Sequence, residues 1–212
     1  MPVFTIPDAI SFGWSKVREN LGLFVAIALL AGAVTGLGQI FFRWPPLSAP
    51  LSWILGVLVE MGLIRFTLRY HDRGQAEFKD LMPPWERFLE FFGGTILYSL
   101  IVLGGTILLI VPGIIWGIQY AFYGYLVIDG KLSAMDALRR SAEITRNHKG
   151  HLFLLGLALA GINLLGAICF GIGLLVTMPI SLMAIAYVFR RLSAAIPAGP
   201  FQTLPVTTQA PA

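Results

Sequence analysis

The stretch that decides the fold runs from Ser133 to Leu165 and reads SAMDALRRSAEITRNHKGHLFLLGLALAGINLL. Its first part has the period of an amphipathic helix, because apolar and charged side chains fall on opposite arcs of a helical wheel. Ser133 and Asp136 have the spacing of a capping box, which starts a helix. Such a helix is expected to lie flat at a membrane surface before the apolar run begins. The apolar arc holds Ala134, Met135, Ala137, Leu138, Ser141, Ala142, Ile144 and Thr145, and the polar arc holds Asp136, Arg139, Arg140, Glu143, Arg146 and Asn147.

The same element occurs again near the N-terminus. Thr5 and Asp8 form a second capping box, 128 residues before the first, and proline is tolerated in the first helical turn that follows. Lys16 and Arg18 then precede an uncharged run over 21–42, as the cations of the first copy precede its apolar run. The capping box, the apolar arc, the basic end and the apolar run follow each other at the same spacing in both stretches. We therefore interpret the two stretches as repeats.

The composition is that of a membrane protein. Hydrophobic residues make up 57% of the 212 residues and charged residues 12%, against about 25% charged in soluble domains. The run over 21–42 is long enough to span a bilayer, and a second span is predicted over 51–68. Six spans of about 20 residues leave no room for a second folded domain.

Two longer uncharged runs are each predicted to form a hairpin. Phe91 to Ile128 and Leu152 to Phe189 would each extend about 57 Å as a single helix, beyond the ~30 Å hydrocarbon core. Helix-breaking residues stand near the middle of both runs, Pro112-Gly113 in one and Gly171-Ile172-Gly173 in the other. Each run is therefore expected to fold as two spans with a tight turn, and Pro179 is expected to kink the last one.

The predicted fold class is all-α: an integral membrane protein with six transmembrane helices in three hairpins, each preceded by an amphipathic helix at the inner surface. The third amphipathic helix is predicted over 71–91, with a restart at Pro83-Pro84, and it matches the other two only loosely. Residues 1–192 are expected to form one domain. Residues 193–212, rich in Pro, Ala and Thr, are expected to form a disordered tail.

The positive charges predict the orientation. In the six-span arrangement, Arg43 is the one cation on the outer face, and the other 14 of the 15 Lys and Arg residues lie on the inner face. By the positive-inside rule both termini are cytoplasmic. The predicted location is the bacterial cytoplasmic (inner) membrane.

Short motifs in a fixed order carry a resemblance to a known family. They are Val111-Pro112-Gly113-Ile114-Ile115, Tyr120-Ala121-Phe122-Tyr123-Gly124-Tyr125, Ala137-Leu138-Arg139-Arg140-Ser141, Asn147-His148-Lys149-Gly150 and Leu152-Phe153-Leu154. The chain resembles the uncharacterised bacterial polytopic membrane proteins related to the membrane domain of glycerophosphoryl diester phosphodiesterase, over about half its length. The resemblance implies a six-span inner-membrane protein. It implies almost nothing about chemistry, because the namesake activity belongs to a separate soluble domain in some members.

Three polar residues are candidates for a role inside the membrane: Glu60, Gln119 and Asn163. A carboxylate at membrane depth is costly, so Glu60 is protonated, paired or facing a cavity. One interpretation is a proton or cation relay. The favoured one is a structural acid that bonds Gln119 or Asn163, or pairs with Arg65, because the sequence offers no second carboxylate for a relay.

A basic group after the first capping box is the candidate site for anionic lipid. The same cations are also explained by topology alone. The metal interpretation of His148 and His151 lacks a third ligand, so no metal site is predicted. The group consists of Arg139, Arg140, Arg146, His148, Lys149 and His151.

No catalytic motif is present, so no catalytic residue and no cofactor are predicted. An aromatic cluster, Trp116, Tyr120, Phe122, Tyr123 and Tyr125, is a candidate groove wall or, more commonly, helix packing. The first hypothesis is a non-enzymatic structural, assembly or lipid-interacting protein. The alternatives are a transporter or channel that uses Glu60, and an enzyme acting on lipid headgroups. Expected partners are membrane lipids, chiefly anionic, with a protein partner or a second copy as a further option, and no nucleic acid.

Overall fold

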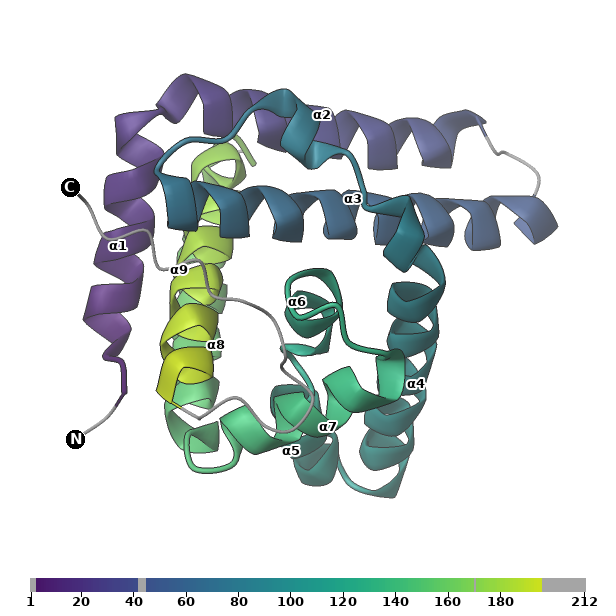
Figure 1. Cartoon of the computed structure of the whole chain (residues 1–212). Coiled ribbons are helices and arrows are strands. Elements are labelled where there is room, and N and C mark those ends of the chain that lie inside the picture. Colours follow the sequence, from purple (N-terminus) through teal and green to yellow (C-terminus); the bar gives the residue numbers. More distant parts are fainter. Residues whose placement is uncertain (1–2, 42–44, 170, 196–212) are drawn as a thin grey trace.

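The computed structural model describes residues 3–41, 45–169 and 171–195. Within these ranges the chain is all-helical and contains no strand, which confirms the predicted class (Figure 1). The elements are α1 (Ile6–Glu19), α2 (Leu21–Phe41), α3 (Pro45–Arg73), the 3₁₀ turns η1 (Phe78–Leu81) and η2 (Trp85–Arg87), α4 (Phe88–Leu108), α5 (Ile110–Gln119), α6 (Tyr123–Ile128), α7 (Ala134–Thr145), α8 (Lys149–Ile168) and α9 (Leu174–Ala195).

In this described part, four helical stretches are long and apolar enough to cross a membrane. They are Phe78–Leu108, Ile110–Ile128, Lys149–Ile168 and Leu174–Ala195. A fifth is added if α1 and α2, bent by 97° at their junction, count as one broken span. In the view of Figure 1, α2 and α3 lie side by side and α9 crosses them. By length and composition, the described residues therefore contain four to five helices that could span a membrane, and the six predicted spans remain a prediction.

The N-cap bond of each predicted capping box is present. The backbone N–H of Asp8 donates to Thr5 Oγ1 over 3.3 Å, and that of Asp136 donates to Ser133 Oγ over the same distance. Each bond satisfies one of the backbone donors that the first turn of a helix leaves unpaired.

Each amphipathic helix ends before the apolar helix that follows it begins. A turn over 146–148 separates α7 from α8, and α1 meets α2 at Asn20. The third predicted amphipathic helix, over 71–91, is replaced by η1 and η2. Pro83 and Pro84 explain this difference, since neither has an N–H to donate and each disfavours the helical conformation in the residue before it.

The apolar arcs of α1 and α7 face the protein rather than lipid. On α1 the buried residues are Ala9, Gly13 and Val17, one per turn, and this stripe packs along α9. On α7 the buried arc packs against α6 and α4. A wheel identifies the face that needs covering, but it cannot distinguish a lipid cover from a protein one.

Tight turns join α4 to α5 and α8 to α9. The first turn lies at Leu109, whose backbone is extended, three residues before the expected Pro112-Gly113. Gly113 instead permits close packing, because a Cβ there would lie 2.3 Å from Thr106 Oγ1. The second turn includes Gly171 at φ +74°, a conformation that favours glycine.

Two predictions fall largely outside the described residues. These are the outer turn at Arg43-Trp44 and the tail over 193–212. Ser193–Ala195, at the start of that tail, are the last residues of α9.

Candidate binding pocket around Glu60

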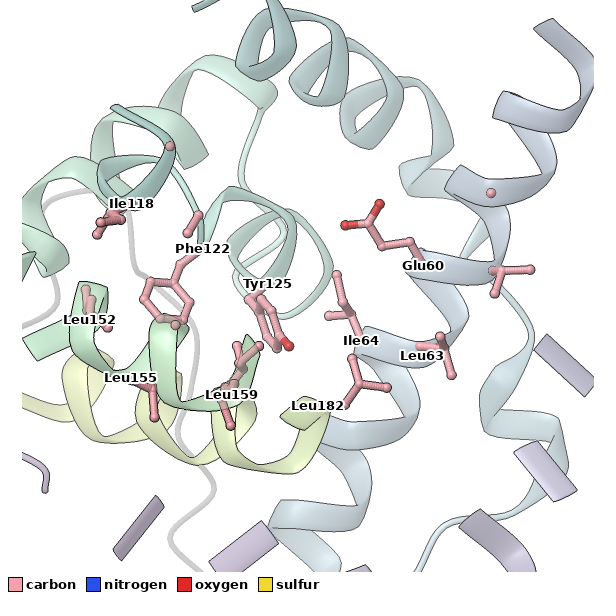
Figure 2. Close-up of a pocket in the computed structure, with 16 residues that line it drawn as sticks. Glu60, Leu63, Ile64, Ile118, Phe122, Tyr125, Leu152, Leu155, Leu159 and Leu182 are labelled. Carbon is pink, nitrogen blue, oxygen red and sulfur yellow. The ribbon is translucent and has the colours of Figure 1, made fainter. Parts of the chain in front are cut away.

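A cavity of about 560 Å³ lies between α3, the α5–α6 segment, α8 and α9. Its wall is apolar apart from Glu60 and the phenol of Tyr125. Figure 2 shows Leu152, Leu155, Leu159 and Leu182 along one side. The full lining is Gly56, Val59, Glu60, Leu63, Ile64, Gly117, Ile118, Ala121, Phe122, Tyr125, Leu152, Leu155, Gly156, Leu159, Leu182 and Ile185.

Glu60 is the acid of this pocket and has no polar partner. Its side chain extends from α3 toward the side of the cavity that carries Phe122 and Tyr125 (Figure 2). The side chain is exposed, and it forms no hydrogen bond or ion pair with any residue in the described ranges. An apolar wall with one unpaired carboxylate is suited to binding a molecule rather than to holding helices together.

The partners expected for Glu60 are engaged elsewhere. Lys149 Nζ donates to Gln119 Oε1 over 2.5 Å, and Asn163 Nδ2 donates to Ser181 Oγ over 2.9 Å. Arg65 donates to the carbonyl oxygen of Met82 over 2.9 Å. Of the three predicted intramembrane polar residues, Glu60 alone lines the cavity. Gln119 joins α5 to α8, and Asn163 joins α8 to α9.

The break between α5 and α6 forms one wall of the pocket, and α7 supports it. An interrupted helix leaves backbone groups without partners, which is costly in an apolar environment. Two hydroxyls of α7 supply the bonds. Ser141 Oγ and Thr145 Oγ1 donate to the carbonyl oxygen of Gln119 over 3.0 and 3.1 Å, and the N–H of Phe122 donates to Ser141 Oγ over 3.2 Å. These hydroxyls belong to the arc that the sequence presented as lipid-facing.

Tyr125 lines the cavity together with Glu60, and a stacked pair of tyrosines, one on α4 and one on α6, lies outside the lining. The rings of Tyr98 and Tyr123 stack with centroids 5.2 Å apart, and Tyr123 Oη bonds Thr95 Oγ1 over 2.9 Å. Of the predicted aromatic cluster, Phe122 and Tyr125 line the cavity. Tyr98 was missed because it lies on α4, far away in sequence.

The predicted lipid-binding cations have separate neighbours. Arg140 pairs with Glu143 over 2.8 Å and Arg139 with Asp136 over 4.0 Å. His148 and His151 both lie against the ring of Phe4, with centroids 6.4 Å away in each case. Lys149 bonds Gln119, and Arg146 is exposed. Among the residues that the structure describes, no group of three or more His, Cys, Asp or Glu could hold a metal ion.

A second, charged cavity of about 320 Å³ lies where the basic ends of α3 and α9 meet η2 and the segment after α6. Arg190 is central to it: its guanidinium donates to Asp72 Oδ1 and Asp129 Oδ1, over 2.9 Å in each case. No local sequence pattern predicts this cavity, because four distant segments contribute to it. Its charged residues are Arg65, Arg69, Asp72, Glu86, Arg87, Asp129, Lys131 and Arg190.

Comparisons with known proteins find distant relatives. A protein of Mycobacterium bovis is 24% identical over 226 aligned residues, which cover 90% of this chain and 69% of the relative. Two proteins of Mycobacterium tuberculosis, from the CDC 1551 and H37Rv strains, are 24% and 23% identical over the same shares. All three carry the name uncharacterized protein. No protein-family model matches the chain, and no solved structure is significantly similar to it.

Proposed function

We propose that this chain is a non-enzymatic protein of the bacterial cytoplasmic membrane that binds a lipid-like molecule in the Glu60 pocket. The observation that carries the proposal is the wall of that pocket, a large apolar surface with a single carboxylate. Its volume of about 560 Å³ lies within the range of small-molecule sites, about 300–1,000 Å³. No pair of groups suited to acid–base or nucleophilic chemistry accompanies Glu60 in the lining.

The surface of the helices supports the membrane setting. Large apolar side chains are exposed along α8 and at the α4–α5 turn, for example Leu157 at 61% and Ile107 at 77%. Contiguous apolar surface of this kind is unusual on a soluble protein and is expected of one that contacts lipid. Six spans, with both termini on the cytoplasmic side, fit the distribution of Lys and Arg. The resemblance to the phosphodiesterase-related membrane proteins points the same way.

Pocket-filling variants test the proposal. Gly156 lines the pocket, and a Cβ built there meets nothing within 4 Å. Gly156→Phe should therefore occupy the cavity without displacing the backbone. Gly161→Phe is the matched control, because Gly161 lies on the same helix, also faces open space and does not line the cavity.

The measurement is native mass spectrometry of the gently extracted protein, with the retained lipids identified. We expect Gly156→Phe to lose a bound species that the wild type and Gly161→Phe both keep. Equal retention by all three proteins would refute binding in this pocket.

A further inference from the structure

The geometry points to a defined ligand class for the Glu60 pocket: a long apolar chain that bears one cationic amine. This inference rests on the proposed binding function and specifies its ligand. Three observations carry it: the unpaired carboxylate, the aromatic rings that line the pocket with it and the absence of positive charge from the lining.

The carboxylate lacks a counter-charge. Acids at membrane depth are usually paired with a cation or with backbone groups. Arg65, the cation one helical turn from Glu60 along α3, is turned away to the carbonyl oxygen of Met82. A ligand ammonium would supply both the missing charge and the hydrogen-bond donors, and such charge-assisted bonds are the stronger kind.

The aromatic surroundings favour a cation over a neutral polar group. Tyr125 lines the pocket together with Glu60. The face of an aromatic ring attracts ammonium groups, and proteins recognise quaternary ammonium ligands with cages of such rings. Phe122, also in the lining, adds a further ring.

The rest of the wall excludes other headgroups. None of the described residues that line the cavity is Lys or Arg. A phosphate or carboxylate headgroup would therefore meet Glu60 without any compensating cation, which is unfavourable in a site of low dielectric constant. Anionic lipids are thus excluded from this pocket, and a phosphate-bearing zwitterionic lipid would leave its phosphate unpaired.

Three probes of equal chain length test the ligand class: dodecylamine, dodecanol and dodecanoate. The amine is cationic at pH 7, because its pKa is close to that of a lysine side chain, about 10.4. Binding of each probe to the purified full chain is measured by native mass spectrometry, for the wild type, Glu60→Gln and Gly156→Phe. Glu19→Gln is the control for loss of an acid, since Glu19 is exposed and does not line the pocket.

We expect the wild type and Glu19→Gln to bind dodecylamine about tenfold more tightly than dodecanol, a difference of about 1.4 kcal/mol. Glu60→Gln should bind the two equally, and Gly156→Phe should bind neither. Equal binding of dodecylamine and dodecanol by the wild type would overturn the ligand class while leaving the pocket-binding proposal intact. Failure of all three probes to bind the wild type would overturn both. If Glu60→Gln fails to fold, loss of amine binding in Gly156→Phe, with binding retained in Gly161→Phe, supports the assignment.

Discussion

Gly13 lies directly against Ile180, so close that a Cβ on Gly13 would be 2.5 Å from the carbonyl oxygen of Ile180. The contact joins α1 to the middle of α9, and no side chain fits between the two backbones. Since α1 has few other neighbours, this approach holds it in place.

Gly13→Val should therefore separate α1 from α9. Forcing carbon atoms into a packed contact costs about 1–3 kcal/mol, and here the obstacle is backbone, which cannot rotate away. We expect a lower thermal unfolding midpoint in detergent. Gly22→Val is the control, because a Cβ at Gly22 meets nothing within 4 Å. An unchanged midpoint for Gly13→Val would mean that α1 does not pack on α9 as described.

Ser141 and Thr145 should matter for stability although they lie on an apolar arc. The double variant Ser141→Ala, Thr145→Val removes the hydroxyls that bond the carbonyl oxygen of Gln119 and the N–H of Phe122. A buried backbone group left without a partner costs about 1–3 kcal/mol. We expect faster amide hydrogen exchange over 119–125 and a lower unfolding midpoint. Ser99→Ala, at an exposed position of α4, should change neither. Unaltered exchange in the double variant would contradict the role of α7 as support for the pocket wall.

The ion pairs of Arg190 with Asp72 and Asp129 should make the free energy of unfolding depend on pH in the acid range. Burial by itself would raise the pKa of Asp72, but the hydrogen bond from His71 and the charge of Arg190 outweigh it and lower the pKa. Because the folded-state pKa lies below the unfolded value of about 3.9, the stabilisation is complete above that value. It is lost as pH falls through the lower, folded-state pKa.

Arg190→Gln should remove this contribution. We expect its unfolding midpoint to be lower than that of the wild type at pH 6, with the two curves converging as pH falls through the lowered folded-state pKa of Asp72. Arg146→Gln, at an exposed position, serves as the comparison. A constant difference between wild type and Arg190→Gln from pH 6 to the acid limit would show that Asp72 is not the group involved.

We expect the charged cavity to be the better location for an anionic headgroup. Arg65, Arg87 and Lys131 line it together, whereas Arg139 and Arg140 pair with acids of their own helix and Arg146 is exposed outside it. Each surface cation contributes about 1 kcal/mol to anionic lipid binding. Replacing the first three by Gln should therefore reduce co-purifying anionic lipid several-fold. Replacing the second three should reduce it less, as quantified by lipid mass spectrometry. A larger loss of anionic lipid on replacing Arg139, Arg140 and Arg146 would instead favour the basic group that the sequence predicts as the lipid site.

Local signals in the sequence predicted local structure well. The capping residues Thr5 and Ser133 start helices as expected, because a cap requires only residues three positions apart. The glycine turn at Gly171 follows from local backbone geometry in the same way. Pro83 and Pro84 were recognised as an interruption, but their effect on the residues before them was underestimated, so a helix was expected where two 3₁₀ turns form.

The sequence predicted one residue of the candidate site, Glu60, but not the residues around it. Glu60 stood out because acids are rare in apolar runs. Its isolation depends on where Gln119, Asn163 and Arg65 find other partners, and those partners come from distant segments. The sequence could not predict the charged cavity for the same reason. Its walls come from four segments that are far apart in the sequence: α3, η2, the segment after α6, and α9.

The packing of α1 against α9 at Gly13 and Ile180 has a consequence for biosynthesis. Ile180 is translated about 170 residues after Gly13. At bacterial synthesis rates of about 5–20 residues per second, the ribosome needs roughly ten to thirty seconds to supply the partner of α1. During that interval the stripe of Ala9, Gly13 and Val17 has no α9 to cover it, so lipid headgroups, the insertion machinery or a chaperone must shield it. The packing of α9 on α1 can therefore form only late in synthesis, long after α1 itself has left the ribosome.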